Sequence, residues 1–93
     1  MQLLSICIPT FNRQKKLKLM LDSINSNTDV EIIICDDGST DETQKIVDSF
    51  TDRLKIKYIY QKNLGVSAAI LNAYNQASGK YLIKMDSDDC FSD

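Results

Sequence analysis

The chain has 93 residues, of which 43% are hydrophobic, and its formal net charge is −2 at pH 7. This length suits one small domain, and a charge so close to zero argues against a nucleic-acid-binding protein. No apolar run is long enough to span a membrane, the N-terminus lacks the pattern of a signal peptide, and the absence of histidine removes the commonest general base.

The first predicted element is a strand over residues 3–8, LLSICI, which is almost wholly apolar. A helix is predicted next, from four apolar residues that recur at helical spacing: Leu17, Met20, Leu21 and Ile24. Residues 30–35, VEIIIC, predict a second apolar strand. Two such strands are typical of a parallel sheet that is covered on both faces.

The second predicted helix contains Ile46, Val47 and Phe50, and it follows the tetrapeptide STDE. In that tetrapeptide Ser39 would be the N-cap, and Glu42 lies three residues later. This spacing predicts a capping box at the start of the helix.

Residues 55–60, KIKYIY, predict a third strand, which begins by alternating lysine with apolar residues. We expect it at an edge of the sheet, because lysine there discourages pairing with another chain. A third helix is predicted from apolar residues at helical spacing, namely Val66, Ala69, Ile70, Ala73 and Ala77. It would end with Gly79 at the C′ position, and residues 80–85 predict a fourth strand.

Strands and helices therefore alternate along the whole chain, which is the signature of βαβ units. We predict one α/β domain over residues 1–93, with an open parallel sheet of about four strands and βαβ crossovers. The three cysteines, Cys7, Cys35 and Cys90, share no metal-ligand spacing. Because Cys7 and Cys35 lie in apolar runs, we expect buried, reduced thiols and a cytosolic location.

Polar residues follow each predicted strand. These segments are PTFN (9–12), DDGS (36–39), KNLG (62–65) and DSDD (86–89). Each one alone is explained as a turn or a helix cap. The carboxyl ends of parallel strands share one rim, however, and ligands bind at that rim in open α/β sheets. We therefore expect the four segments to form one site.

The predicted site is rich in carboxylates and poor in cations. Such a site suits a phosphorylated ligand held through a divalent cation, because hard oxygen ligands select Mg²⁺ or Mn²⁺. The cation would stabilise charge on a departing diphosphate. Asp36 and Asp37 are suited to accept hydrogen bonds from a base or a sugar hydroxyl.

The segments SICIPTFNR, IIICDDGSTDET, NLGVSAA and GKYLIKMDSDD occur in this order. Together they resemble the nucleotide-binding half of the family 2 inverting glycosyltransferases, and the resemblance covers nearly the whole chain. It implies the Rossmann-like half of the glycosyltransferase A-type fold and metal-dependent binding of a UDP-sugar. It also implies inverting transfer to a hydroxyl of an acceptor sugar or a lipid-linked sugar, in cell-surface polysaccharide biosynthesis. The expected location is the cytoplasm or the inner face of the membrane.

The resemblance also assigns roles by position. Pro9 and Thr10 match residues that line the nucleoside pocket. Asp36 matches the aspartate that hydrogen-bonds the uracil ring, and Asp37 and Ser39 complete that motif.

Asn12, Asn63 and Gly65 complete the predicted nucleotide-binding set. Asp86 and Asp88 match the D-x-D pair of the family. Asp86 would contact the ribose or the sugar of the donor and Asp88 would coordinate Mn²⁺ or Mg²⁺, so both are candidate metal ligands.

The chain departs from the family pattern NxGxSxARNxG at Ile70, where an arginine is common, and at Ala73, where a glycine is common. Family enzymes also continue into a segment that binds the acceptor and carries a carboxylate general base, which we expect beyond Asp93. The chain therefore looks like a fragment of a longer enzyme that is inactive by itself. The alternatives are a non-catalytic nucleotide-binding module and a sugar-nucleotide pyrophosphorylase-like domain, although PTFNRQKK lacks the glycine of pyrophosphorylase loops.

In the strand order usual for the family, 3-2-1-4, the fourth strand would present an exposed apolar edge here. Such an edge tends to pair with another chain. We therefore expect either self-association through residues Tyr81–Met85 or partial disorder after Met85.

Overall fold

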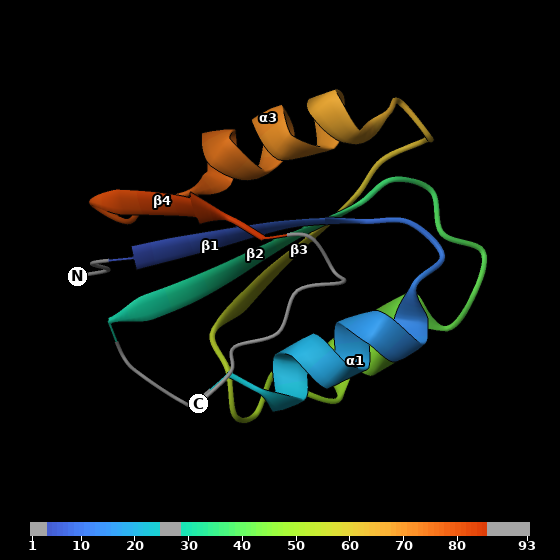
Figure 1. Ribbon diagram of the computed structural model, residues 1–93, viewed down its shortest axis with the longest axis horizontal. Coiled ribbons are helices and arrows are strands. Elements are labelled where there is room, and N and C mark those ends of the chain that lie inside the picture. Colours follow the sequence, from blue (N-terminus) through green and yellow to red (C-terminus); the bar gives the residue numbers. More distant parts are fainter. Residues whose placement is uncertain (1–3, 25–28, 86–93) are drawn as a thin grey trace.

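Seven elements alternate between strand and helix in the computed structural model, which describes residues 4–24 and 29–85. Their bounds are β1 Leu4–Thr10, α1 Gln14–Asp22, β2 Val30–Asp36, α2 Thr43–Asp48, β3 Ile56–Tyr60, α3 Val66–Gln76 and β4 Tyr81–Lys84. The strands form one sheet, with α1 and α2 on one face and α3 on the other (Figure 1).

Every strand pair in this sheet is parallel, and the order across it is β3-β2-β1-β4. The predicted α/β class, the parallel sheet and the strand order are therefore confirmed. β3 lies at an edge, as its lysines predict. In the register Thr10 pairs with Asp36 and Asp36 pairs with Tyr60, so β1, β2 and β3 end together at one rim.

The core has two layers because alternate residues of a strand face opposite sides of the sheet. The layer under α1 and α2 includes Ile6, Ile8, Ile32, Ile34, Leu17, Met20 and Val47. The layer under α3 includes Cys7, Ile33, Cys35, Ala69 and Ala73.

The two cysteines in this layer, Cys7 and Cys35, are free and fully buried, as predicted. Burial and nearby carboxylates raise the pKa of both thiols to about 11, so they stay protonated at neutral pH.

β1 runs to Thr10, two residues past the end predicted from the sequence, and so it contains Pro9. Even-numbered residues of β1 bond toward β2, as Leu4 N does with Asp29 O at 3.0 Å. The nitrogen of Pro9 therefore faces the β4 side, where the pairing stops at Cys7. Among the residues that the structure describes, none of β4 pairs with Pro9, so the missing N–H of proline is tolerated inside the strand.

The predicted capping box is wrong. α2 begins at Thr43, its N-cap is Glu42, and that residue makes no side-chain cap hydrogen bond. Ser39 lies outside the helix, where its backbone N donates to Asp36 Oδ1 at 2.9 Å. Asp41 instead accepts a hydrogen bond from Thr43 N at 3.0 Å, so this side chain satisfies one backbone N–H of the first turn.

Gly79 is not the C′ residue of α3, which ends at Gln76 and is followed by an extended Ala77. Gly79 is needed for a close approach instead. A Cβ at this position would lie 2.5 Å from Ser5 Oγ and 2.7 Å from Ser5 N. Only glycine lets the segment before β4 pass this close to β1.

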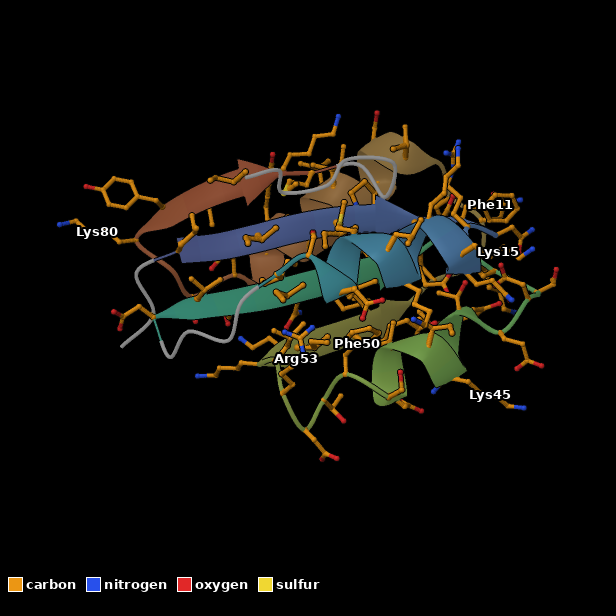
Figure 2. All side chains as sticks on the ribbon, turned by 60° about the horizontal axis from the view of Figure 1, so that its bottom comes forward. Phe11, Lys15, Lys45, Phe50, Arg53 and Lys80 are labelled. Atoms are coloured by element: carbon orange, nitrogen blue, oxygen red, sulfur yellow. The ribbon has the colours of Figure 1, made fainter. Side chains whose placement is uncertain are left out.

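Arg53, in the segment between α2 and β3, closes the layer of α1 and α2. Its guanidinium donates to Ile24 O at 2.5 Å and to Leu21 O at 2.7 Å, at the C-terminal end of α1. It also lies over the ring of Phe50, 5.4 Å from the centroid (Figure 2). Hydrogen bonds to a charged group contribute about 1.5–3 kcal/mol each. Arg53 therefore stabilises the domain through contacts that lie far from the rim.

Candidate functional site

The carboxyl ends of β1, β2 and β3 form a continuous rim. Asp37 N donates to Thr10 O at 2.9 Å, and Gln61 N donates to Asp36 O at 2.9 Å. The segments after these three strands are therefore neighbours, as the sequence predicts. Pro9, Thr10 and Asp36 are the last strand residues, and the other predicted nucleotide contacts apart from Asp86 follow in the adjoining loops.

The segment after β4 contains Asp86 and Asp88, which lie outside the described residues. β4 runs parallel to β1 toward the same edge, and its last described contact is the hydrogen bond from Met85 N to Cys7 O at 2.9 Å, three residues before β1 ends at Thr10. Within residues 4–24 and 29–85, no group of three or more His, Cys, Asp or Glu side chains is arranged to hold a metal ion. The described carboxylates therefore do not make a metal centre, and the metal ligands remain a sequence prediction.

Asp36 is buried beneath the loop after β2, with 1% of its surface exposed. Its Oδ1 accepts from Ser39 N at 2.9 Å, and its Oδ2 accepts from the hydroxyl of Tyr58. Burial, together with this hydrogen bond and the negative charge of Asp36, raises the pKa of Tyr58, so the phenol remains a donor. Asp36 is thus held rigidly, and its contact with a nucleobase stays a prediction.

Asp37 binds the loop after β3. Its Oδ1 accepts from Gln61 Nε2 at 2.7 Å and from Leu64 N at 2.6 Å, and its Oδ2 accepts from Gly65 N at 3.0 Å. Burial of Asp37 favours a higher pKa, but these three hydrogen bonds outweigh it and lower the pKa below its ordinary value. The carboxylate of Asp37 therefore fixes two loops of the rim together.

The loop after β3 needs unusual backbone conformations to fit against Gly38. Asn63 has φ of 33° and Gly65 has φ of 100°, both in the left-handed region. Gly38 has φ of 88°, and a Cβ there would lie 3.0 Å from Asn63 N. Asn63 and Gly65, which were predicted as nucleotide contacts, thus shape the rim through their backbone.

The loop after β1 is braced against the loop after β2. Asn12 N donates to Ser39 Oγ at 2.8 Å, and Thr40 N donates to Asn12 Oδ1 at 2.8 Å. Gln14 N also donates to Asp41 Oδ2 at 3.3 Å. Asn12 and Ser39 therefore hold the loops in place, whereas their predicted contact with a nucleotide is not tested by these bonds.

An open groove lies beside this brace, lined by Phe11, Asn12, Arg13, Gln14, Lys15, Lys16 and Asp41. Phe11 is 43% exposed, and Figure 2 shows its ring beside Lys15 at one end of the molecule. An exposed aromatic ring among cations suits a planar, negatively charged ligand. Thr10 comes directly before Phe11 and is not one of the groove-lining residues; its hydroxyl is buried and has no hydrogen-bond partner among the described residues.

Three contributors to the rim were missed by the sequence interpretation: Phe11, Gln61 and Asn72. Gln61 links Asp37 to α3, because its Oε1 accepts from Asn72 Nδ2 at 2.5 Å. No local pattern marks that link. Phe11 could have been found, because a large aromatic residue directly after a strand in a polar loop is a signal in the sequence.

Comparison with known proteins gives a family match over almost the whole chain. The model of "Glycosyl transferase family 2" matches residues 5–93. Validoxylamine A glucosyltransferase of Streptomyces hygroscopicus subsp. limoneus is 45% identical over 71 residues, which are 72% of this chain and 16% of that protein.

Two solved structures share the fold. One is S. aureus TarS 1-349 in complex with UDP-GlcNAc, with a TM-score of 0.90 and 31% identity over 97% of this chain and 27% of that one. The other is the mannosyltransferase PcManGT of Pyrobaculum calidifontis in complex with GDP-Man and Mn²⁺, with a TM-score of 0.87. It is 22% identical over 95% of this chain and 28% of its own, so this second likeness concerns the fold alone.

The chain spans less than a third of the length of each of these proteins. Within the described residues, none of the helices has the length and apolar character required to cross a membrane.

Proposed function

Because the chain belongs to glycosyl transferase family 2, we propose that it forms the donor-binding part of an enzyme that transfers a sugar from a nucleoside diphosphate to an acceptor hydroxyl. The family match over residues 5–93 carries this proposal. The rim supports it, because its loops are fixed beside an aromatic and basic groove. UDP is the proposed nucleotide, supported by the motif around Asp36 and by the UDP-GlcNAc bound to the 31% identical TarS.

In this proposal the rim binds the nucleoside, and the cations of the groove attract the diphosphate. The ring of Phe11 offers an exposed face for the base, and the unpartnered hydroxyl of Thr10 offers a hydrogen bond. Lys15 and Lys16 place positive charge in the same groove. The role of Asp37 is to keep the loops in the binding conformation before the ligand arrives, which lowers the ordering cost of binding.

A divalent cation is proposed from the sequence motif alone. Asp86 and Asp88 would hold Mn²⁺ or Mg²⁺, whose chemistry is to stabilise negative charge on the departing diphosphate. Inverting transfer, the acceptor site and its carboxylate base are likewise proposals. They concern a whole enzyme, because this chain covers less than a third of the length of each matched relative.

Titration calorimetry of the chain with UDP tests the donor proposal. We expect one UDP to bind in the presence of Mn²⁺, more weakly in EDTA, and GDP and dTDP to bind less tightly than UDP. Phe11→Ala should weaken UDP binding about tenfold, because stacking of one base on an aromatic ring contributes about 1–3 kcal/mol. The matched control is Leu19→Ala, which removes an apolar side chain that is 61% exposed, compared with 43% for Phe11, from α1 and outside the residues that line the groove.

Two results would contradict the donor proposal. One is the absence of heat with all three nucleotides. The other is UDP binding that Phe11→Ala and Leu19→Ala change equally, because the groove would then play no part in recognition.

We also propose that the chain self-associates through β4. Tyr81, Leu82 and Ile83 are 58%, 47% and 44% exposed, and β4 pairs only with β1 among the described strands. Light scattering should show a dimer that dissociates on dilution, and Leu82→Lys should shift the equilibrium to monomer, because charge on an edge strand opposes pairing. A strict monomer over the whole concentration range would refute self-association.

A further inference from the structure

A buried carboxylate lies at the end of the sheet opposite the rim. Glu31 on β2 is 1% exposed. Its Oε2 accepts from Ser5 Oγ at 2.6 Å, from Ser78 N at 2.6 Å and from Ser78 Oγ at 2.8 Å. Gly79 N donates in turn to Ser5 Oγ at 2.8 Å. We call these four residues, Ser5, Glu31, Ser78 and Gly79, the Glu31 clamp.

The clamp costs desolvation that an apolar contact would avoid. The only cation that pairs with Glu31 among the described residues is Lys57, whose Nζ lies 3.4 Å from Oε1 and whose side chain is 44% exposed. Oε1 itself has no hydrogen-bond partner among the described residues. A buried ion pair of this kind adds little stability over apolar packing, so geometry is the better explanation for a carboxylate here.

The geometry that the clamp fixes is the approach to β4. The residues that donate hydrogen bonds from this segment, Ser78 and Gly79, come directly before Lys80 and the start of β4 at Tyr81. All four side chains of β4 are exposed, so burial of an apolar face does not select its register. The hydrogen bonds that Ser78 and Gly79 donate to Glu31 and Ser5 are side-chain contacts that a shift of β4 along β1 would break.

β4 runs from the clamp in the direction of the rim. Lys80, next to the clamp, lies at the opposite end of the molecule from Phe11 (Figure 2). The strand then runs along β1 until Met85 N bonds to Cys7 O at 2.9 Å. A slip of one residue would move the end of β4 by about 3.3 Å and would turn each side chain to the other face.

We propose that the Glu31 clamp is the positioning element that sets the register of β4 on β1 and so fixes the position of Met85, after which the proposed metal ligands Asp86 and Asp88 follow in the sequence. The part of this inference that concerns the donor rests on the proposed function. The part that concerns the register does not, since it follows from the hydrogen bonds and the exposure of β4 alone.

Hydrogen exchange tests the register in the absence of ligand. The variants are Glu31→Gln and Ser78→Ala, with Ser78→Thr as the conservative variant that keeps the hydroxyl. We expect exchange at the amides of β4 and Met85 to accelerate about tenfold more than at the amides of β2 in the first two variants. Ser78→Thr should restore the native pattern.

Arg53→Met is the matched control for stability. It removes charged hydrogen bonds of comparable strength but at the end of α1, so β4 and β2 should accelerate in step. If Glu31→Gln and Ser78→Ala also accelerate β4 and β2 in step, or accelerate neither, the clamp does not set the register. If Glu31→Gln fails to fold, Ser78→Ala and Ser78→Thr decide the question.

Calorimetry with UDP and Mn²⁺ tests the link to the donor site. Ser78→Ala should weaken UDP binding by about tenfold, because small misplacements of binding groups have large effects. Arg53→Met should leave UDP binding unchanged. If Ser78→Ala accelerates exchange selectively in β4 but binds UDP as tightly as the parent chain, the proposed link to the donor site is wrong, whereas the role of the clamp in the register of β4 is supported. A parent chain that binds no UDP would refute the proposed function, and the link to the donor site with it, but not the effect of the clamp on β4.

Discussion

Replacing Asp37 with alanine is expected to lower the free energy of unfolding by about 3 kcal/mol and to abolish nucleotide binding. The substitution removes the acceptor of three hydrogen bonds, from Gln61, Leu64 and Gly65. Each donor left unsatisfied in a buried place costs about 1–3 kcal/mol. A domain of this size has a total stability of about 5–15 kcal/mol, so the loss is large.

Chemical denaturation measures the first effect, and calorimetry with UDP measures the second. Asp37→Asn separates the effect of side-chain shape from that of charge. The amide keeps one oxygen that accepts hydrogen bonds, but it replaces the other oxygen with an NH₂ group that would face a backbone or side-chain N–H. We expect it to be less destabilising than Asp37→Ala but still defective in UDP binding. Asp52→Asn, at an exposed site after α2, is the control and should leave both quantities unchanged. A fully stable Asp37→Ala would show that the loops after β2 and β3 do not depend on this carboxylate.

Acidification is expected to remove about 3 kcal/mol of stability through Glu31 alone. Burial of Glu31 favours a higher pKa, but the hydrogen bonds from Ser5 and Ser78 and the charge of Lys57 outweigh it and lower the pKa to about 2. The ordinary value is 4.5. Because the folded pKa is depressed, protons bind the unfolded chain more readily. The stabilisation is therefore complete above pH 4.5 and is lost as the pH falls toward 2.

The measurement compares denaturation of the parent chain and Glu31→Gln from pH 7 to pH 2. Glu31→Gln should be less stable at pH 7 and should lose less stability on acidification, so the two curves converge below pH 4.5. Other carboxylates, Asp37 among them, titrate in both proteins and cancel in the comparison. Curves that stay parallel would show that Glu31 has an ordinary pKa and that its hydrogen bonds are weak.

The strands and their shared rim could be predicted from the sequence because burial leaves a local trace. Apolar runs such as 30–35 mark strands covered on both faces, and parallel strands must end on the same side. The predicted buried state of Cys7 and Cys35 follows from the same pattern. The order of the strands came from the resemblance to family 2 rather than from any periodicity.

The wrong predictions have a common physical cause, which is competition from distant residues. Ser39 and Gly79 both stand where local rules place helix caps. Ser39 is engaged by Asn12, which is 27 positions away, and Gly79 by Ser5, which is 74 positions away. Local rules compare only near neighbours, so they could not anticipate these contacts.

Local patterns and motifs were therefore enough to infer the α/β class, the positions of the strands and the family to which the chain belongs. Only the folded arrangement shows which polar side chains of the rim hold loops together, as Asp37 does. It also showed the clamp around Glu31, which a strand pattern hides because a single buried carboxylate among apolar residues looks like an exposed position. The reason is that hydrogen bonds between segments far apart in the chain depend on a geometry that exists only after folding.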